Sequence, residues 1–449
     1  MQSDQYSIFK AYDIRGEVGS TLTKEFVKRI ARAYGTWLPV KGTVAVGHDM
    51  RPDSQDLTLA FIDGLTDMGI EVWDIGLVTS DMIYFAVGKW ELAGGAVITA
   101  SHNPGKDNGI KLYRDKVTPV GLDSGLDKIR DMALSVEDIP LPGPKSTVKQ
   151  RSITEDWVSH CLSFISSLKQ FNIAIDAGNG MAGAILPSIL PSLPLKTKNL
   201  YFDLDGSFPN HEANPMKPEN LEDLAETVKK DGLDFGIAFD GDGDRAGFVD
   251  DLGRPVSGSD LMSIVSRLIL KQDPGSKIVY DVRASRSTVE LIREWGGQPV
   301  RCKAGRVYIG AKMREIGASF GGETTGHLFF KDNYDADSGL IGALVAMQAI
   351  SDSGKKLSEL VDMYHRYVTT PEINMAVKED KEEVFKRLRH VYTDYDQDEL
   401  DGLTVNGEGF WFNLRASNTE PLMRLNAEAK TQPVLDRIVD NVTKLVIGK

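Results

Sequence analysis

Short apolar runs followed by polar turns that contain aspartate recur three times along the chain. The runs are Thr43–Val46, Asn172–Ile175 and Ser276–Tyr280, and each is rich in β-branched residues. The turns after them read GHDMRPDS, DAGNGMAG and DVRASRST, and helical patterns follow, for example at Leu57–Met68 and Thr288–Trp295. Strand, turn and helix in this order form the unit of an α/β domain, whose ligand sites lie at the carboxyl ends of strands. The pattern predicts three comparable α/β domains.

The last ~80 residues have a different pattern, too short for another domain of the typical ~150 residues. A charged helical segment, Lys378–Tyr392, precedes strand-like segments with hairpin turns expected at Asp401-Gly402 and Asn406-Gly407. An amphipathic helix is expected at Gln432–Val446. We expect a smaller α+β domain here.

Changes in composition suggest where the domains meet. Ile139–Lys149 is rich in proline and is typical of a linker, and turns at Asp251–Arg254 and Thr369–Pro371 separate further segments. The predicted domains are residues 1–148, 149–252, 253–368 and 369–449.

Composition excludes several classes of protein. The 449 residues include 52 Lys and Arg against 65 Asp and Glu, a net charge of −13, which argues against nucleic-acid binding. Only two cysteines occur, Cys161 and Cys302, so a disulfide scaffold is not expected and a reducing cytoplasm fits. Neither a signal-peptide pattern nor an apolar run of ~18 residues is present, so no membrane association is expected.

The strongest local signal is DGDGDR, which brings Asp240, Asp242 and Asp244 close together after the apolar strand expected at Phe235–Phe239. Carboxylates this close stay ionised together most easily around a hard divalent cation, and open coordination positions for a phosphate oxygen suit Mg²⁺. An EF-hand Ca²⁺ loop is the alternative. It does not fit, because Arg245 stands where that loop needs glycine and its twelfth position holds aspartate rather than glutamate.

Ser101 is the candidate nucleophile. It lies in TASHNP, after a strand expected at Gly94–Ile98, in a turn of small residues that would leave its hydroxyl exposed. A Ser-His-Asp hydrolase would also use a serine, but no G-x-S-x-G motif is present. Beside a metal site, the serine can carry a phosphoryl group.

Two further loops could recognise a substrate. RASNTEP places Arg415 among hydroxyl and amide groups, which supply the donors and the positive charge that a phosphate dianion requires. GGETTGH, after a strand expected at Ala318–Phe320, offers Glu323 to the hydroxyls of a polyol.

These four motifs stand in the order found in the α-D-phosphohexomutase superfamily, and the chain most resembles its bacterial phosphomannomutase/phosphoglucomutase branch. FKAYDIRG, NGIK, DAGNGMAG and DGSFPNHEANPMKPENL also resemble that branch, and the similarity runs from Phe9 to about Ala427. The resemblance implies three related α/β domains with mixed sheets plus a smaller C-terminal α+β domain, in a heart shape around a central cleft.

The resemblance also implies an intramolecular phosphotransferase that interconverts hexose 6-phosphate and hexose 1-phosphate, with mannose and/or glucose as the sugar. Ser101 would be a phosphoserine, and hexose 1,6-bisphosphate would be both intermediate and activator. Mg²⁺ would be held by the phosphate of Ser101 together with Asp240, Asp242 and Asp244.

Each motif residue takes an expected role. Lys111 and Arg15 are the first candidates for the general base and His327 is the next, while His102 would donate to the phosphate of Ser101. The expected substrate-binding residues are Glu323, Thr325, Arg245, Arg283, Arg306, Arg415, Ser417, Asn418 and Thr419. The expected partners are small sugar phosphates, with no nucleic acid and no membrane, and the expected assembly is a monomer or dimer in the cytoplasm.

Three positions depart from that branch. Thr325 stands where serine is usual, Arg283 where lysine is frequent, and Arg306 where histidine is common. A phosphoglucosamine mutase is the nearest alternative, although its loop usually carries an acid-Gln-Ser arrangement where this chain has Thr324-Thr325. A metal-dependent phosphohydrolase and a catalytically silent sugar-phosphate-binding protein are more distant alternatives.

Overall fold

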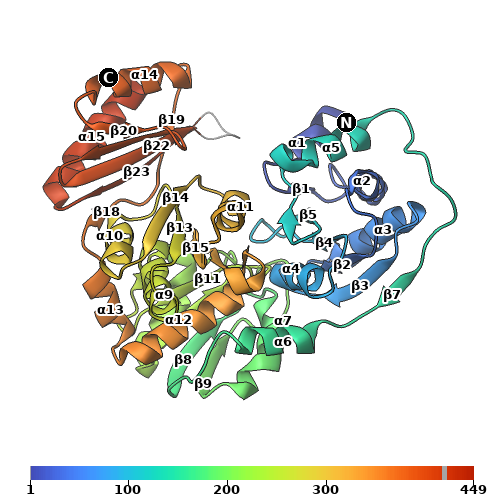
Figure 1. Ribbon diagram of the computed structural model, residues 1–449, viewed down its shortest axis with the longest axis horizontal. Coiled ribbons are helices and arrows are strands. Elements are labelled where there is room, and N and C mark those ends of the chain that lie inside the picture. The colour runs from blue at the N-terminus through green and yellow to red at the C-terminus, as the bar shows by residue number, and fades with distance from the viewer. Residues whose placement is uncertain (1, 417–421, 449) are drawn as a thin grey trace. The chain divides into compact units, whose positions relative to one another are not determined.

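The computed structural model describes residues 2–416 and 422–448, which divide into two compact units (Figure 1). The first unit contains residues 1–257 and 325–358, and the second contains residues 258–324 and 359–449. Helix α13 (Leu357–Tyr364) crosses from one to the other. We describe each unit by itself.

The first unit begins with a mixed sheet in the order β1-β5-β4-β2-β3-β7, with β6 paired to β5. Strands β4, β2, β3 and β7 are parallel, whereas β5 is antiparallel to β4 and to β1. Apolar residues of α2, α3 and α5 build the core against this sheet. The elements are α1 (Gln2–Ser7), β1 (Ile14–Glu17), α2 (Lys24–Trp37), β2 (Val44–His48), α3 (Ser54–Asp67), β3 (Val72–Leu77), α4 (Ser80–Lys89), β4 (Gly94–Ile98), β5 (Asp107–Arg114), β6 (Thr118–Pro119), α5 (Leu126–Leu134) and β7 (Val148–Gln150).

A second mixed sheet of the first unit has the order β12-β11-β10-β8-β9. Strands β10, β8 and β9 are parallel, and β11 turns back beside β10. The first unit also contains the antiparallel pair β16 and β17 and the apolar helix α12. The elements are α6 (Thr154–Leu162), β8 (Phe171–Asp176), α7 (Ala182–Ile189), β9 (Leu195–Leu200), α8 (Glu222–Asp231), β10 (Phe235–Phe239), β11 (Ala246–Val249), β12 (Pro255–Val256), β16 (Leu328–Phe330), β17 (Ala336–Asp337) and α12 (Gly339–Ser353).

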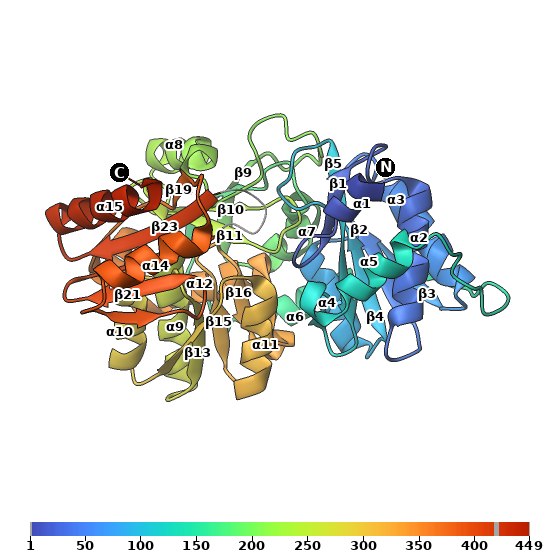
Figure 2. The same cartoon turned by 90° about the horizontal axis from the view of Figure 1, so that it is seen from above.

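The second unit contains the parallel strands β14, β13 and β15 and an antiparallel sheet in the order β18-β23-β22-β21-β20, with β19 also paired to β23. Helices α14 and α15 pack on the antiparallel sheet and form one apolar core with it (Figure 2). The elements are α9 (Gly258–Gln272), β13 (Lys277–Asp281), α10 (Arg286–Glu294), β14 (Gln298–Cys302), α11 (Arg306–Ile316), β15 (Phe320–Gly322), β18 (Val368–Thr369), β19 (Ile373–Ala376), α14 (Lys381–Val391), β20 (Asp396–Asp398), β21 (Leu403–Gly407), β22 (Phe410–Ala416), β23 (Leu422–Ala429) and α15 (Gln432–Ile447). Short 3-10 turns complete the two units, at Leu122–Ser124, Leu190–Ser192, Pro218–Leu221 and Lys331–Asn333.

The threefold repeat expected from the sequence recurs in atomic detail. Asp49, Asp176 and Asp281 are buried at the carboxyl ends of β2, β8 and β13. Each Oδ1 accepts from the backbone N–H two residues later, at 3.0, 2.7 and 2.7 Å respectively. This shared turn confirms the three related α/β domains.

One predicted turn is wrong. Asn406 and Gly407 lie inside β21, opposite Trp411 and Phe410, and the chain reverses two residues later. Asn-Gly is a strong local turn signal, but the pairing of β21 with β22 carries the strand through it. Asp401 and Gly402 do lie between β20 and β21, as expected.

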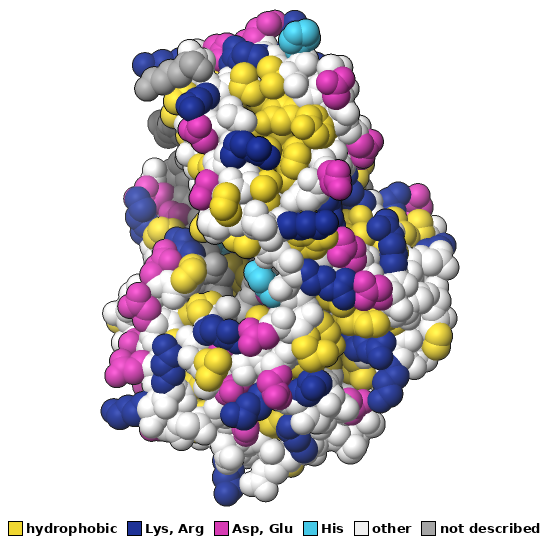
Figure 3. Space-filling view, turned by 90° about the vertical axis from the view of Figure 1, so that its left-hand side faces the viewer, with side chains coloured by type: hydrophobic (Ala, Val, Ile, Leu, Met, Phe, Trp, Pro, Cys, Tyr) yellow, Lys and Arg dark blue, Asp and Glu magenta, His cyan; other side chains and the backbone are white. Residues whose placement is uncertain are grey.

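Charged side chains of both signs are mixed on the surface. Lys and Arg side chains are interspersed with Asp and Glu over the face shown in Figure 3. The excess of acidic residues that gives the net charge of −13 therefore forms no acidic patch on this face. No helix within residues 2–416 and 422–448 is both long and apolar enough to cross a membrane.

Candidate active site

Three buried aspartates converge after β10. One carboxylate oxygen from each of Asp240, Asp242 and Asp244 lies within 4.8 Å of the others, and these side chains are at most 1% exposed. Gly241 lets this loop approach the serine loop, because a Cβ there would lie 2.4 Å from the carbonyl oxygen of Ser101. The sequence therefore folds into a concentrated negative charge beside Ser101.

The ionisation of these aspartates depends on nearby cations. Burial, opposed by Arg245 and reinforced by Asp244 and Asp242, raises the pKa of Asp240 to about 7. Burial and Asp244 act to raise the pKa of Asp242 as well, but the ammonium of Lys111 outweighs them and the pKa falls below its usual value. Lys111 thus favours the ionised form of Asp242, whereas at Asp240 burial and the neighbouring aspartates outweigh the charge of Arg245.

The residues present fit a divalent cation. Asp242 Oδ1 is buried and accepts no hydrogen bond from the described residues, although buried carboxylate oxygens normally find a partner. Oxygen donors from three carboxylates are the ligands that hard cations prefer. This acidic triad could therefore hold a metal ion.

Lys111 and Ser80 complete the surroundings of the triad. Lys111 Nζ donates to Asp242 Oδ2 and, at 2.6 Å, to Asp244 Oδ2. Ser80, at the start of α4, donates to the same oxygen of Asp242. Sequence reasoning missed Ser80, because its only sequence signal is a serine after a threonine at the start of a helix.

Ser101 lies between strand β4 and the triad. Its Oγ donates to Asp240 Oδ2 at 3.0 Å, and its backbone φ of +51° is in the left-handed region that residues other than glycine rarely adopt. Such strain tends to occur at functional sites, where the surroundings hold the residue in place. The structure thus brings the predicted nucleophile to the predicted metal ligands.

Arg51 holds the serine loop in shape, and sequence reasoning missed it. Its guanidinium donates to the carbonyl oxygens of Ser101, Asn103, Pro104 and Asp107, at 2.6 to 2.9 Å. It is 3% exposed. The available signal was its place two residues after Asp49 in the polar turn.

Three further predicted residues surround Ser101. Arg15 donates to the carbonyl oxygen of Ala100 at 3.0 Å, and Arg245 Nε donates to Asp240 Oδ2 at 2.9 Å. Arg245 Nη2 lies 2.6 Å from His102 Nδ1, which must accept because arginine only donates. Burial, with the charges of Arg245 and Arg15, lowers the pKa of His102 to about 2. The imidazole is therefore neutral, with its proton on Nε2.

His327 belongs to a second group of acids in the first unit. Its Nδ1 lies 2.6 Å from Asp337 Oδ2 and 3.8 Å from Asp244 Oδ1. Asp337, at the end of β17, orients the ring beside the triad. Thr325 precedes His327 in the same loop and also lies in the first unit.

Glu323 and Arg283 meet in the second unit. Arg283 Nη2 donates to Glu323 Oε1 and to Asp281 Oδ2, each at 3.0 Å. Burial acts against this cation, but the charges of Asp281 and Glu323 outweigh it and raise the pKa of Arg283. Thr324 N–H also donates to Asp281 Oδ2 at 2.7 Å, which fixes the loop that carries Glu323.

The remaining predicted binding residues also lie in the second unit. Arg306 is the first residue of α11, after Gly305, whose φ of +132° favours glycine. Arg415, near the end of β22, donates to Glu372 Oε2 at 2.8 Å. Ser417, Asn418 and Thr419 lie outside the described residues.

Models of one protein family match this chain in four consecutive segments. The phosphoglucomutase/phosphomannomutase models match four times: α/β/α domain I at residues 6–138, domain II at 155–253, domain III at 257–367 and the C-terminal domain at 372–445.

Relatives match over nearly the whole chain. A protein of Xanthomonas campestris described as phosphohexose mutases is 39% identical over 432 residues, covering 95% of this chain and 96% of the relative. The phosphomannomutase/phosphoglucomutase of Pseudomonas aeruginosa is 36% identical, covering 96% and 94%. The crystal structure of a phosphoglucomutase/phosphomannomutase family protein from Burkholderia thailandensis superposes with a TM-score of 0.91 at 31% identity, covering 98% of each chain. The chain therefore belongs to the phosphoglucomutase/phosphomannomutase family of phosphohexomutases, which are isomerases.

Proposed function

We propose that this chain interconverts hexose 6-phosphate and hexose 1-phosphate through a phosphorylated Ser101, with mannose and/or glucose as the sugar. One observation carries the proposal: Ser101 Oγ lies 3.0 Å from Asp240 Oδ2, beside a buried acidic triad. A protein that only bound sugar phosphates would need neither a strained serine nor this triad. We propose hexose 1,6-bisphosphate as both intermediate and activator.

Mg²⁺ is the metal that we propose for the triad. Asp240, Asp242 and Asp244 would hold it together with the phosphate of Ser101, because Mg²⁺ in proteins is bound by a few carboxylates and a phosphate. When bound, it neutralises charge on the transferring phosphoryl group.

The protein's own residues position and protonate the reacting groups. The Oγ–P bond of Ser101 breaks as a sugar hydroxyl forms a new O–P bond, and the hydroxyl proton passes to a general base. Lys111 and Arg15 are the first candidates from the sequence and His327 is the next. His327 can accept a proton as a neutral imidazole and Lys111 only as a deprotonated amine, whereas the guanidinium of Arg15 only donates and would instead offset charge on the phosphoryl group. Arg15 and Arg245 already lie beside the Ser101 loop, and His102 would donate to the phosphate from Nε2. The bisphosphate then reorients within the site without leaving it, and its other phosphoryl group is transferred back to Ser101.

A sugar that binds in two orientations needs recognition common to both. We propose that Glu323 and Thr325 bind its hydroxyls. Arg283 and Arg306, which lie in the same unit as Glu323, would also bind the substrate. The phosphate that is not transferred would bind to the loop of Arg415, Ser417, Asn418 and Thr419.

We propose four domains, residues 1–148, 149–252, 253–368 and 369–449. Edge strands β7, β12 and β18 lie at or just beyond these limits and pair with the preceding or following sheet. We also propose a cytoplasmic monomer or dimer.

A panel of mannose, glucose and glucosamine 1-phosphates, each with Mg²⁺ and a trace of its 1,6-bisphosphate, tests the function. We expect the mannose or glucose substrate to give the 6-phosphate fastest, with no release of inorganic phosphate. Fastest conversion of the glucosamine substrate would favour a phosphoglucosamine mutase. Steady phosphate release without an isomer would favour a phosphohydrolase.

Arg306 offers a test of sugar selectivity. Its long cation stands where the resemblance leads one to expect an imidazole, so Arg306→His should change the ratio of kcat/KM for mannose and glucose phosphates by about three- to tenfold. Arg437→His, at an exposed position of α15, is the matched control and should leave that ratio unchanged. An unchanged ratio in Arg306→His would remove this residue from the sugar contacts.

A further inference from the structure

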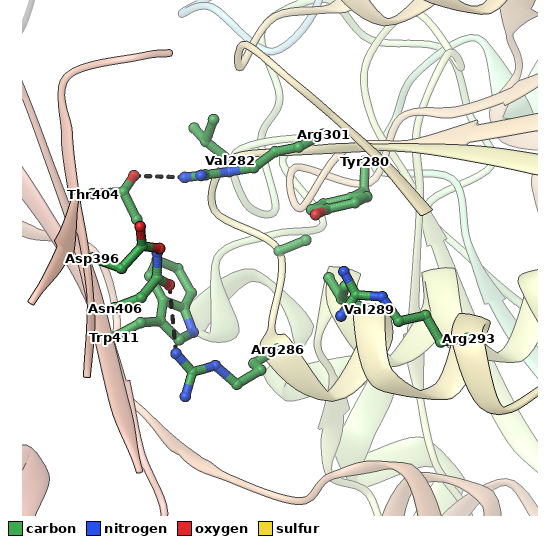
Figure 4. A pocket seen from close by; sticks show the side chains of 11 residues that line it. Tyr280, Val282, Arg286, Val289, Arg293, Arg301, Asp396, Thr404, Asn406 and Trp411 are labelled. Carbon is green, nitrogen blue, oxygen red and sulfur yellow. Dashed lines mark hydrogen bonds between the residues drawn. The ribbon is translucent and has the colours of Figure 1, made fainter. Parts of the chain in front are cut away.

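A basic pocket in the second unit is separate from the residues assigned to catalysis. Its volume is about 300 Å³, and it lies between the elements β13, α10 and β14 and the strands of the antiparallel sheet. Figure 4 shows the guanidinium groups of Arg286 and Arg301 reaching toward those strands. The lining residues are Tyr280, Val282, Ala284, Arg286, Val289, Arg293, Arg301, Asp396, Thr404, Asn406 and Trp411.

The charge of the pocket is positive. Arg286, Arg293 and Arg301 line it against the single carboxylate of Asp396. Asp398, which does not line the pocket, lies 3.2 Å from Arg301 Nη1 and offsets part of that charge. Glu428 Oε1, which accepts from the backbone N–H of Arg286 at 3.1 Å, is a further acid nearby, but burial raises its pKa to about 7 and so lowers its negative charge near neutral pH. Among the residues that line the pocket, three arginines face one carboxylate.

Two of the arginines are fixed, and the third is available. Arg301 Nη2 donates to Thr404 Oγ1 at 2.5 Å, and Arg286 donates to the carbonyl oxygens of Gly407 and Phe410 at 3.3 and 3.2 Å. The guanidinium of Arg293 makes no hydrogen bond or ion pair with the described residues, and the residue is exposed. The guanidinium of Arg293 therefore keeps its donors for an oxyanion, while the two anchored guanidinium groups supply fixed positive charge beside it.

Tyr280 lines the same pocket, at β13. Burial raises the pKa of its hydroxyl, the charges of Arg301 and Arg293 oppose that rise, and the charge of Asp398 adds to it. Asp396 stands on the opposite wall, where it can accept from a hydroxyl of a ligand.

We infer that this pocket binds a phosphate dianion, either free or as the ester of a small polyhydroxy compound. The three arginines would hold the phosphate, while Asp396 would accept from a hydroxyl of an ester. A bound phosphate would link α10 and β14 to the antiparallel sheet. The inference is independent of the proposed reaction, because none of these residues has a role in it.

Trp411 provides a readout that does not depend on activity. The full chain is labelled with 5-fluorotryptophan, and its ¹⁹F resonances are followed during titration with inorganic phosphate and, separately, with glycerol 1-phosphate. Trp411→Phe identifies the resonance of Trp411. We expect a saturable shift of that resonance with a millimolar Kd, and the ligand with the lower Kd identifies the free or the esterified form.

Two variants locate the binding. Arg293→Gln should raise the Kd about tenfold, because it removes a charged donor at an exposed position where folding is unaffected. Arg437→Gln, outside the pocket, should leave it unchanged. Arg415→Gln weakens the proposed substrate phosphate loop and should also leave the Trp411 shift in place.

Two results would overturn the inference. One is the absence of a saturable shift for both ligands up to ~20 mM, a limit set by the expected millimolar affinity. The other is a shift that is lost in Arg415→Gln and kept in Arg293→Gln, which would show that Trp411 reports on phosphate bound at the loop after β22.

Discussion

Replacement of Ser101 by alanine is expected to lower kcat for hexose phosphate isomerisation by at least about a thousandfold, equivalent to roughly 4 kcal/mol. The physical reason is that Oγ is the atom proposed to carry the phosphoryl group, and within residues 2–416 and 422–448 Ser101 is the hydroxyl that donates to Asp240. A coupled assay for hexose 6-phosphate measures the loss. Intact-protein mass spectrometry should show that one phosphoryl group is absent from the variant.

The control is Ser146→Ala, in the segment before β7 and far in sequence from the triad. It should keep full activity, and both variants should unfold at temperatures near that of the unchanged protein. Activity in Ser101→Ala within tenfold of the unchanged protein would contradict a phosphoserine mechanism.

Asp242→Asn should weaken Mg²⁺ binding and reduce turnover together, each by roughly two orders of magnitude. The change removes one negative charge while preserving shape, and it places an amide where Asp242 Oδ2 now accepts from Lys111 and Ser80. Calorimetric titration with Mg²⁺ and the Mg²⁺ dependence of kcat are the two measurements.

The matched control for that change is Asp231→Asn, on the exposed end of α8. It should alter neither metal binding nor turnover. If Asp242→Asn binds Mg²⁺ as well as the unchanged protein and depends on it in the same way, the metal is not held by this triad.

The sequence predicted those elements whose residues contact near neighbours. Strands β4 and β10 occur at the expected bounds, because buried runs between turn residues carry a clear local signal. The threefold repeat was also readable from its aspartates. The turn expected at Asn406-Gly407 was wrong, since cross-strand pairing with Trp411 overrides a local preference.

The sequence predicted the motif residues that meet around Ser101, but it did not predict the residues that hold them in position. The motif residues were predicted from the chemistry of their side chains, whereas Arg51 and Ser80 act through partners distant in sequence, and Asp337 orients His327 from ten positions away. Ser80 meets Asp242 across 162 positions, and Arg51 meets Ser101 across 50. Only the folded chain shows that Arg51 holds the loop of Ser101 and that Ser80 contacts the triad.

Transfer of labelled phosphate from the enzyme to the sugar is the decisive measurement for a phosphorylated Ser101. The protein is labelled with ³²P at Ser101, freed of excess label and mixed with unlabelled mannose 1-phosphate and Mg²⁺ for a single turnover. We expect the label to appear in hexose 1,6-bisphosphate and hexose 6-phosphate. Recovery of the label as inorganic phosphate, with no hexose 6-phosphate formed, would contradict the phosphoserine mechanism.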